Sequence, residues 1–383
     1  MMSKGAKMDT GLFVATLLLL GLGIVLVYSS SFAVAYGKNL SSNYFLFRQV
    51  TRALIAVILF TFFINVDYRF LSKYAGVIYI FAVILLGSVL LLPESQAING
   101  ARRWITLLGV RFQVSDFARM ALIIFLAKKC GEEGAEFDGW RSLMPHYIRI
   151  GLICALVVLE PDFSTSVIIA GIALAMLFVA GVRPRYLLGT ALAALPVIVA
   201  LIKSAPYRMK RLTGFLNMQE QGQGASYQVS QSLIGLGHGG FLGVGLGKGE
   251  QKNFYLPEPH TDFILSGLGE EFGFVGVMLV FLVFAFIVYR GFVISLNAPD
   301  RTGQIMAFGF TMAIALYMLI HASVVTGLLP PTGVPMPFLS YGGMSLIFTM
   351  SSMGILLNIS SHIKTDTMSI TAPAGPKRKA LRA

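Results

Sequence analysis

Charged residues are scarce in this chain of 383 residues: Asp, Glu, Lys and Arg make up 13% of it, against roughly 25% in soluble proteins. So few charges cannot cover a soluble surface, which excludes a soluble enzyme and a disordered chain. Cysteine is nearly absent, and Cys130 and Cys154 have no metal-type spacing, so neither a disulfide framework nor a cysteine-ligated metal is expected. The net charge of +12 comes from basic residues scattered between apolar runs, which argues against nucleic-acid binding.

Apolar residues are abundant instead, at 56% of the chain. A bilayer core requires about 20 mainly apolar residues per helix. We therefore predict an all-α integral membrane protein, with one membrane domain at residues 1–363 and a disordered, basic cytoplasmic tail at 364–383. Its predicted spans, about ten in number, are residues 10–29, 50–66, 74–92, 113–127, 146–160, 165–182, 185–203, 261–289, 304–326 and 344–361.

The distribution of Lys and Arg between the loops predicts the orientation of these spans. Basic residues near the span ends are counted with the adjoining loops. With a cytoplasmic N-terminus, 17 of the 30 basic residues then fall on the inner side and 12 on the outer side, while Arg119 lies deeper within a span. Both termini are therefore predicted in the cytoplasm. The outer side is more basic than this rule favours, and an anionic ligand on that side would explain the excess.

Residues 204–260 form the only long segment between predicted spans, and glycine is dense from Gly235 to Gly249. The letters GLGHGG at 235–240 match the G-x-G-x-x-G pattern of dinucleotide-binding folds, but no strand precedes them and no βαβ unit fits. Two interpretations remain. The glycines either allow close backbone packing between short helices, or they form a flexible phosphate-contacting loop helped by Lys248 and Lys252.

Three carboxylates follow at the mouth of the predicted eighth span: Asp262, Glu270 and Glu271. A carboxylate placed there is costly unless it functions or is paired. Pro257 and Pro259 prevent an earlier helix start, so Asp262 falls at the first turn. It would then either cap the helix or take part in chemistry. The adjacent glutamates are expected to pack against polar partners rather than lipid.

Several elements of the chain resemble, in the same order, those of the SEDS family of membrane peptidoglycan polymerases, which includes RodA and FtsW. The spacing from Gly243 to Pro257 is more similar to the FtsW branch. The sequence departs from the family at Val114–Arg119, where Pro-Ser-Glu and Ala-Lys are usual. The resembling elements are Asn99–Ile105, Glu160–Thr165, Tyr227–Leu233, Tyr255–Gly273, Thr326–Pro330 and Pro337–Gly343.

The resemblance implies a peptidoglycan glycosyltransferase that polymerises lipid II, a disaccharide-peptide carried on undecaprenyl pyrophosphate, during cell division or elongation. The acceptor 4-hydroxyl attacks the anomeric carbon of the donor, so it needs a base, and the departing pyrophosphate needs cations or a metal ion. Asp262 matches the family's catalytic aspartate and is the candidate base. The candidate substrate-binding residues are Arg102, Arg103, Lys210, Arg211, Lys248, Lys252, Glu258, His260, Ser340 and Tyr341.

Four residues are candidates for supporting the site: Asp116, Arg119, Asp162 and Glu270. Asp116 and Arg119 are three residues apart on one helix face, so an internal ion pair is the plainer interpretation. Asp162 would either cap the sixth span or shape the cavity. For His260, a structural role with satisfied hydrogen bonds is the plainer interpretation.

The resemblance also implies a location in the bacterial inner membrane. The partners that it implies are lipid II, a class B penicillin-binding protein that acts as transpeptidase, and other division or elongation proteins. Nucleic acid is not expected. Mg²⁺ or Mn²⁺ would assist pyrophosphate departure, and no organic cofactor is expected. Two further functions remain open: a lipid II flippase, and a scaffold without activity that recruits a transpeptidase.

Overall fold

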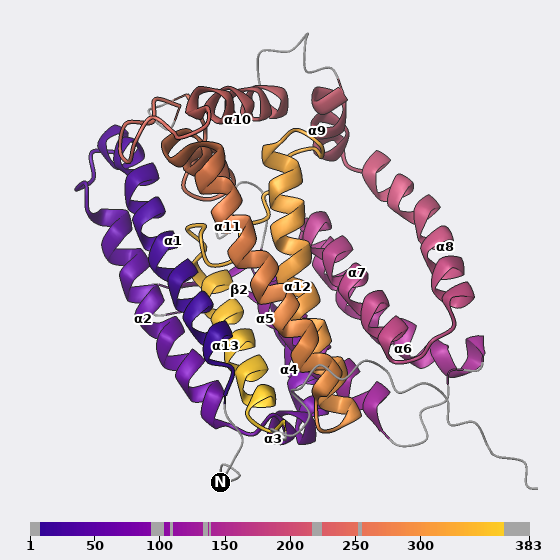
Figure 1. Ribbon diagram of the computed structural model, residues 1–383. Coiled ribbons are helices and arrows are strands. Elements are labelled where there is room, and N and C mark those ends of the chain that lie inside the picture. Colours follow the sequence, from indigo (N-terminus) through magenta and orange to yellow (C-terminus); the bar gives the residue numbers. More distant parts are fainter. Residues whose placement is uncertain are drawn as a thin grey trace, which may run out of the picture.

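The computed structural model describes residues 8–92, 103–107, 110–132, 137, 139–216, 224–251 and 255–363. Helices dominate these residues (Figure 1). Their bounds are α1 (Thr10–Gly37), α2 (Tyr44–Asn65), α3 (Tyr68–Lys73), α4 (Ala75–Leu90), α5 (Val114–Gly131), α6 (Trp140–Leu159), α7 (Phe163–Val179), α8 (Pro184–Lys203), α9 (Pro206–Leu216), α10 (Ala225–Gly239), α11 (Ile264–Asn297), α12 (Arg301–Val325) and α13 (Gly343–Ser360).

Each of the ten predicted spans coincides with a helix. Among the described residues, seven helices are long and apolar enough to cross a membrane: α1, α2, α6, α8, α11, α12 and α13. α4 and α7 are shorter apolar helices, and α5 carries four charged residues along its 18 positions. The chain is thus a multi-pass membrane protein, and ten as the number of spans stays a prediction.

The all-α fold class is confirmed, and a small antiparallel hairpin that was not predicted accompanies the helices. Strand β1 (Trp104–Leu107) pairs with β2 (Val110–Gln113), so that Trp104 lies opposite Gln113. β2 runs directly into α5. The residues of the hairpin are largely β-branched or aromatic, which suits strands. Its eight strand positions are too few, however, for the alternation of polar and apolar residues to stand out beside the long apolar runs. The hairpin places Arg103 beside the loop between α6 and α7.

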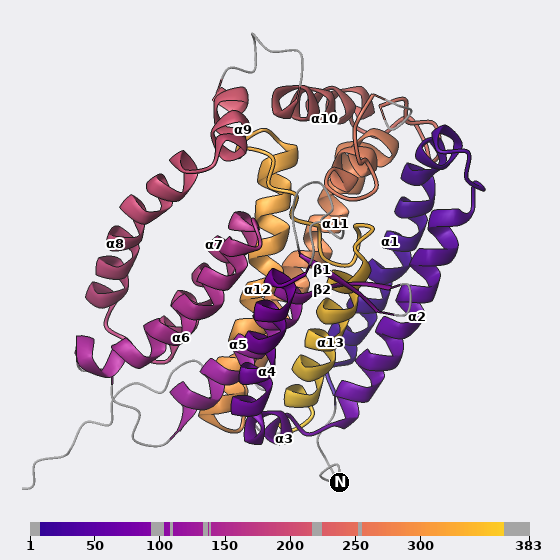
Figure 2. The ribbon, with the colours of Figure 1, turned by 180° about the vertical axis from the view of Figure 1, so that it is seen from behind.

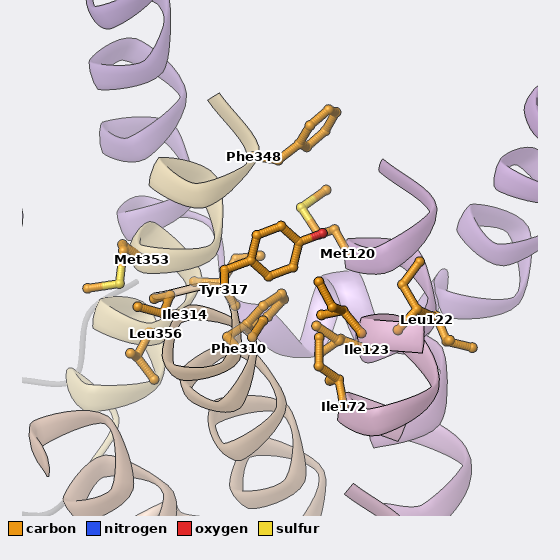
Figure 3. Close-up of a cluster of buried hydrophobic side chains, with 14 of the residues drawn as sticks. Met120, Leu122, Ile123, Ile172, Phe310, Ile314, Tyr317, Phe348, Met353 and Leu356 are labelled. Carbon is orange, nitrogen blue, oxygen red and sulfur yellow. The ribbon is translucent and has the colours of Figure 1, made fainter. Parts of the chain in front are cut away.

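The core of the bundle is formed by α5, α12 and α13. α2 packs along α13, and α12 packs against α5, α7 and α11. Figure 3 shows Met120 of α5, Ile172 of α7, Phe310 and Tyr317 of α12 and Met353 of α13 gathered in one apolar cluster. Nearly every residue of α13 is buried, as expected of a helix surrounded by protein rather than lipid.

α8 stands apart from this core. It lies beside the bundle, with an interval between it and α7 in both views (Figures 1 and 2). Tyr186 is its only buried residue, and Leu188, Leu192 and Leu195 are all more than half exposed. α8 continues into α9, which lies with α10 across the end of the bundle opposite the N-terminus. Residues 204–260 therefore contain the short helices α9 and α10.

Candidate active site

Asp262 lies in a series of tight turns just ahead of α11. The backbone N–H groups of Thr261 and Asp262 both donate to the Glu258 carbonyl, at 3.2 and 3.3 Å, and Glu258 itself has a positive φ of 50°. α11 begins only at Ile264 and has no side-chain cap. The predicted helix start at 261 is therefore wrong by three residues, because residues 261–263 belong to the turns that follow Glu258 and not to the helix. Capping by Asp262 is not seen.

The loop between α12 and α13 fixes this turn from the other side. The Ser340 hydroxyl donates to the Thr261 carbonyl at 2.7 Å and accepts from the Met336 N–H at 2.9 Å. The Tyr341 N–H donates to the His260 carbonyl at 2.8 Å. Ser340 was predicted to bind substrate, but both of these contacts commit its hydroxyl to the protein. Ser340 therefore positions the Asp262 turn.

An aromatic cluster packs behind the same turn. The His260 ring lies 4.8 Å from Phe45 and 5.2 Å from Tyr341, measured between centroids. Burial and the nearby Lys38 lower the pKa of His260 to about 4, so its imidazole is neutral at pH 7. The guanidinium of Arg52 lies 4.5 Å above the Tyr341 ring. His260 and Tyr341 thus support the turn, and Arg52 is a neighbour that the sequence did not single out.

The carboxyl of Asp262 has an unusual environment for a residue at the protein surface. Burial raises its pKa to about 6, the Glu258 carboxylate adds to that rise, and Arg211 of α9 opposes it. Gly333 borders the carboxylate, since a Cβ built there would lie 3.6 Å from Asp262 Oδ2. α9 thus places the positive charge of Arg211 near enough to lower the pKa of Asp262. Lys210, its neighbour on α9, has an exposed side chain.

Arg103 is bound to the loop between α6 and α7. Its Nε donates to the Glu160 carbonyl at 3.1 Å, its Nη2 donates to the Pro161 carbonyl, and its Nη1 lies 3.9 Å from Asp162 Oδ1. Asp162 also accepts from the Thr165 N–H at 3.4 Å as the N-cap of α7. The capping role expected for Asp162 is therefore present. Arg103 was predicted to bind substrate, and these contacts use its guanidinium to hold the loop.

Asp116 and Arg119 form the internal ion pair expected from their spacing. Arg119 Nη2 lies 3.4 Å from Asp116 Oδ1, and both side chains are buried. The Arg119 guanidinium also stacks 4.3 Å from the Tyr317 ring centroid.

Glu160, two residues before Asp162, is fully buried. Its carboxylate oxygens have no hydrogen-bond partner among the described residues.

The glycine-rich segment packs directly onto the first turns of α11. Glu270 accepts hydrogen bonds from the N–H groups of Glu250 at 2.7 Å and Gln251 at 3.1 Å, and its Oε1 lies 3.1 Å from His238 Nδ1. Glu271 accepts from the Ser29 hydroxyl at 2.5 Å. Both glutamates thus have the polar partners that were expected, and Glu270 anchors this loop.

The close-packing interpretation of the glycines is supported by their surroundings. A Cβ on Gly239 would lie 2.0 Å from the Gly269 carbonyl oxygen, and one on Gly243 would lie 2.2 Å from that of Glu271. The Lys248 side chain is exposed on this loop. Arg102 and Lys252, the other two predicted substrate contacts, lie outside the described residues.

Fold and site together define a multi-pass helical membrane protein with a carboxylate of raised pKa at one end of its bundle. Residues 10–365 match the profile of the FtsW/RodA/SpoVE family, described as "Cell cycle protein". The chain therefore belongs to this family, and the SEDS resemblance is confirmed.

Two curated relatives match nearly the whole chain. Stage V sporulation protein E of Bacillus subtilis is 40% identical over 363 residues, which are 94% of this chain and 99% of that protein. The "Probable peptidoglycan glycosyltransferase FtsW" of Trichlorobacter lovleyi is 38% identical over 363 residues, 94% of each chain. These relatives agree with the predicted similarity to the FtsW branch.

Solved structures share the fold. The structure described as "Structural coordination of polymerization and crosslinking by a peptidoglycan synthase complex" matches with a TM-score of 0.75 at 24% identity, over 92% of this chain and 97% of that one. The crystal structure of the Rod shape determining protein RodA of Thermus thermophilus matches with a TM-score of 0.69 at 24% identity, over 92% and 96%.

Proposed function

We propose that this chain is a peptidoglycan glycosyltransferase that polymerises lipid II, with Asp262 as the general base. The family membership and the relatives named peptidoglycan glycosyltransferase support the reaction. The observation that carries the residue assignment is the environment of Asp262, a partly buried carboxyl whose pKa is raised to about 6. A base is most useful when its pKa lies near the working pH.

The chemistry follows from the charges around this carboxyl. Ionised Asp262 accepts the proton of the acceptor sugar's 4-hydroxyl as the new glycosidic bond forms at the donor's anomeric carbon. Negative charge develops on the departing pyrophosphate, so a cation placed nearby stabilises the transition state. The charge of Arg211 lowers the pKa of Asp262, and Arg211 is the cation that we assign to the pyrophosphate. Lys210 extends the positive charge along α9.

An assay on purified protein in detergent distinguishes a polymerase from a transporter, because lipid II cannot be transported without a bilayer. We expect the chain to convert labelled lipid II into glycan strands, resolved by gel electrophoresis. As a partner we propose a class B penicillin-binding protein, whose addition is expected to raise the rate, since new strands must be crosslinked. Failure to polymerise with and without that partner would favour the flippase or the scaffold.

We further place the Asp262 site outside the cytoplasm and both termini inside, on the basis of the Lys and Arg distribution. α9 and α10 lie at the end of the bundle opposite the N-terminus, which fits this orientation. A cysteine introduced at Ser230 of α10, in a variant whose Cys130 and Cys154 are replaced by serine, should react with a membrane-impermeant thiol reagent in intact cells. Labelling only after lysis would reverse the orientation.

The pH dependence of polymerisation should reveal the Asp262 base. Its pKa near 6 predicts that activity falls as pH drops through 6, because the protonated carboxyl accepts no proton. Arg211 lowers this pKa, so Arg211→Gln should raise it and move the acidic limb to higher pH. The profile of log kcat/KM against pH measures both. An acidic limb that stays in place in Arg211→Gln would contradict the effect of Arg211 on the pKa of Asp262.

A divalent cation is proposed as an aid to pyrophosphate departure. Among the residues that the structure describes, no three His, Cys, Asp or Glu side chains converge as a metal site. The phosphate oxygens would therefore supply most ligands to Mg²⁺ or Mn²⁺, which retain several waters. Excess EDTA is expected to slow polymerisation, and added Mn²⁺ to restore it. Equal rates with and without EDTA would remove the metal from the mechanism.

A further inference from the structure

An open cavity of about 580 Å³ lies along the first three turns of α6, far in the chain from Asp262. It is lined by two arginines, a tryptophan and three apolar residues, and nothing in the proposed reaction uses them. The lining residues are Trp140, Arg141, Met144, Pro145, Ile148 and Arg149.

The two arginines give this cavity a positive charge that no carboxylate of the described residues neutralises. Within the part of the chain that the structure describes, neither Arg141 nor Arg149 has a carboxylate partner. Arg141 is exposed, and Arg149 is half-buried with its guanidinium 5.5 Å from the Phe125 ring centroid. Eight residues separate them, about 12 Å along the helix, so both long side chains can reach one anion between them.

The remaining lining suits a lipid rather than a free ion. Met144 and Ile148 lie between the arginines on the same stripe and are 50% and 63% exposed. Trp140 stands edge-on to Tyr186 of α8 with centroids 5.2 Å apart, and tryptophans collect where hydrocarbon meets the headgroups. Pro145 lacks an N–H, so the Arg141 carbonyl loses its usual helical partner. A polar headgroup with apolar chains matches this combination.

We propose that this cavity is a binding site for an anionic phospholipid of the membrane leaflet at the N-terminal end of α6. The phosphodiester lies between Arg141 and Arg149, and the acyl chains run over Met144 and Ile148. Arg149 lies about two turns into α6 and is half-buried, and a half-buried charge is stabilised by an anionic partner. Basic pockets of this kind at membrane surfaces hold anionic headgroups.

Native mass spectrometry of the full chain in neutral detergent tests the site, with dioleoylphosphatidylglycerol and dioleoylphosphatidylcholine as probes. We expect tighter binding of the anionic lipid by about tenfold or more. Arg141→Gln and Arg149→Gln should each weaken it about fivefold, and together on the order of twentyfold, from roughly 1 kcal/mol for each basic residue near the surface. Lys73→Gln, which removes an exposed basic residue outside the cavity, should leave binding unchanged.

Three results would overturn the proposal: equal binding of the two lipids, full binding by the double variant, or displacement of the lipid by millimolar inorganic phosphate, which would indicate a simple anion site. Arg141 is exposed, so Arg141→Gln alone keeps the fold and still decides the outcome if the double variant unfolds. The experiment measures lipid retention and not polymerisation, so it is independent of the proposed function.

Discussion

Asp262→Asn is expected to reduce lipid II polymerisation by a factor of roughly 10² or more, the usual contribution of a positioned base. Thermal stability should stay unchanged, because the substitution preserves the size of the side chain and no helix cap depends on it. Asn cannot take the proton of the acceptor hydroxyl. Polymerisation and thermal unfolding measured on the same preparation check both halves of this expectation.

Glu250→Gln provides the matched control, since it neutralises an exposed carboxylate of the neighbouring loop. Its backbone N–H, which bonds to Glu270, is retained. This variant should polymerise at the normal rate. Full activity in a normally stable Asp262→Asn protein would end the assignment of Asp262 as the base.

The second large effect is expected at the end of α10, where Gly239→Ala should destabilise the protein by about 3 kcal/mol, the upper end of overpacking costs. The new methyl would meet the Gly269 carbonyl oxygen at 2.0 Å, with the backbone of Glu270 directly behind it. Backbone cannot move aside as a flexible side chain can. The loop that Glu270 anchors would be displaced, and polymerisation should fall with it.

Gly237→Ala is the matched control, because Gly237 lies on the same helix and a Cβ there would meet nothing within 4 Å. Alanine is a better helix former than glycine by about 1 kcal/mol, so this variant should match or exceed the wild type in stability. Thermal unfolding in detergent compares the two variants. Equal stability of both would show that α10 does not pack tightly on α11.

Runs of apolar residues predicted the helices because a membrane-spanning helix is apolar along its whole length, whether a side chain faces protein or lipid. The predicted end of α1 at residue 29 was eight residues short of Gly37, since Ser29, Ser30 and Ser31 resemble a loop in sequence. They are buried against protein instead, with Ser29 bonded to Glu271. Hydropathy cannot distinguish a polar loop from a polar helix face that finds a partner far along the chain.

The site was predictable to a different degree. Asp262 could be selected because carboxylates near a membrane are rare and the surrounding motif resembles the family's. The sequence could not separate Arg211, which interacts with Asp262, from Arg103, whose guanidinium binds backbone carbonyls. Both are arginines of segments predicted to lie outside, and only the tertiary arrangement decides which cation is available. The same holds for Ser340, whose hydroxyl is consumed by neighbouring backbone.

The isolation of α8 makes the thickness of the membrane a variable of the site. Its 20 residues amount to about 30 Å at 1.5 Å per residue, close to the hydrocarbon thickness of a bilayer. A helix with so few protein neighbours adjusts its tilt to hydrophobic mismatch instead of to packing. α8 leads directly into α9, so we expect a thinner or thicker bilayer to change the height of Arg211 relative to Asp262. We therefore expect the acyl-chain length of the lipids to change the electrostatic effect of Arg211 on Asp262.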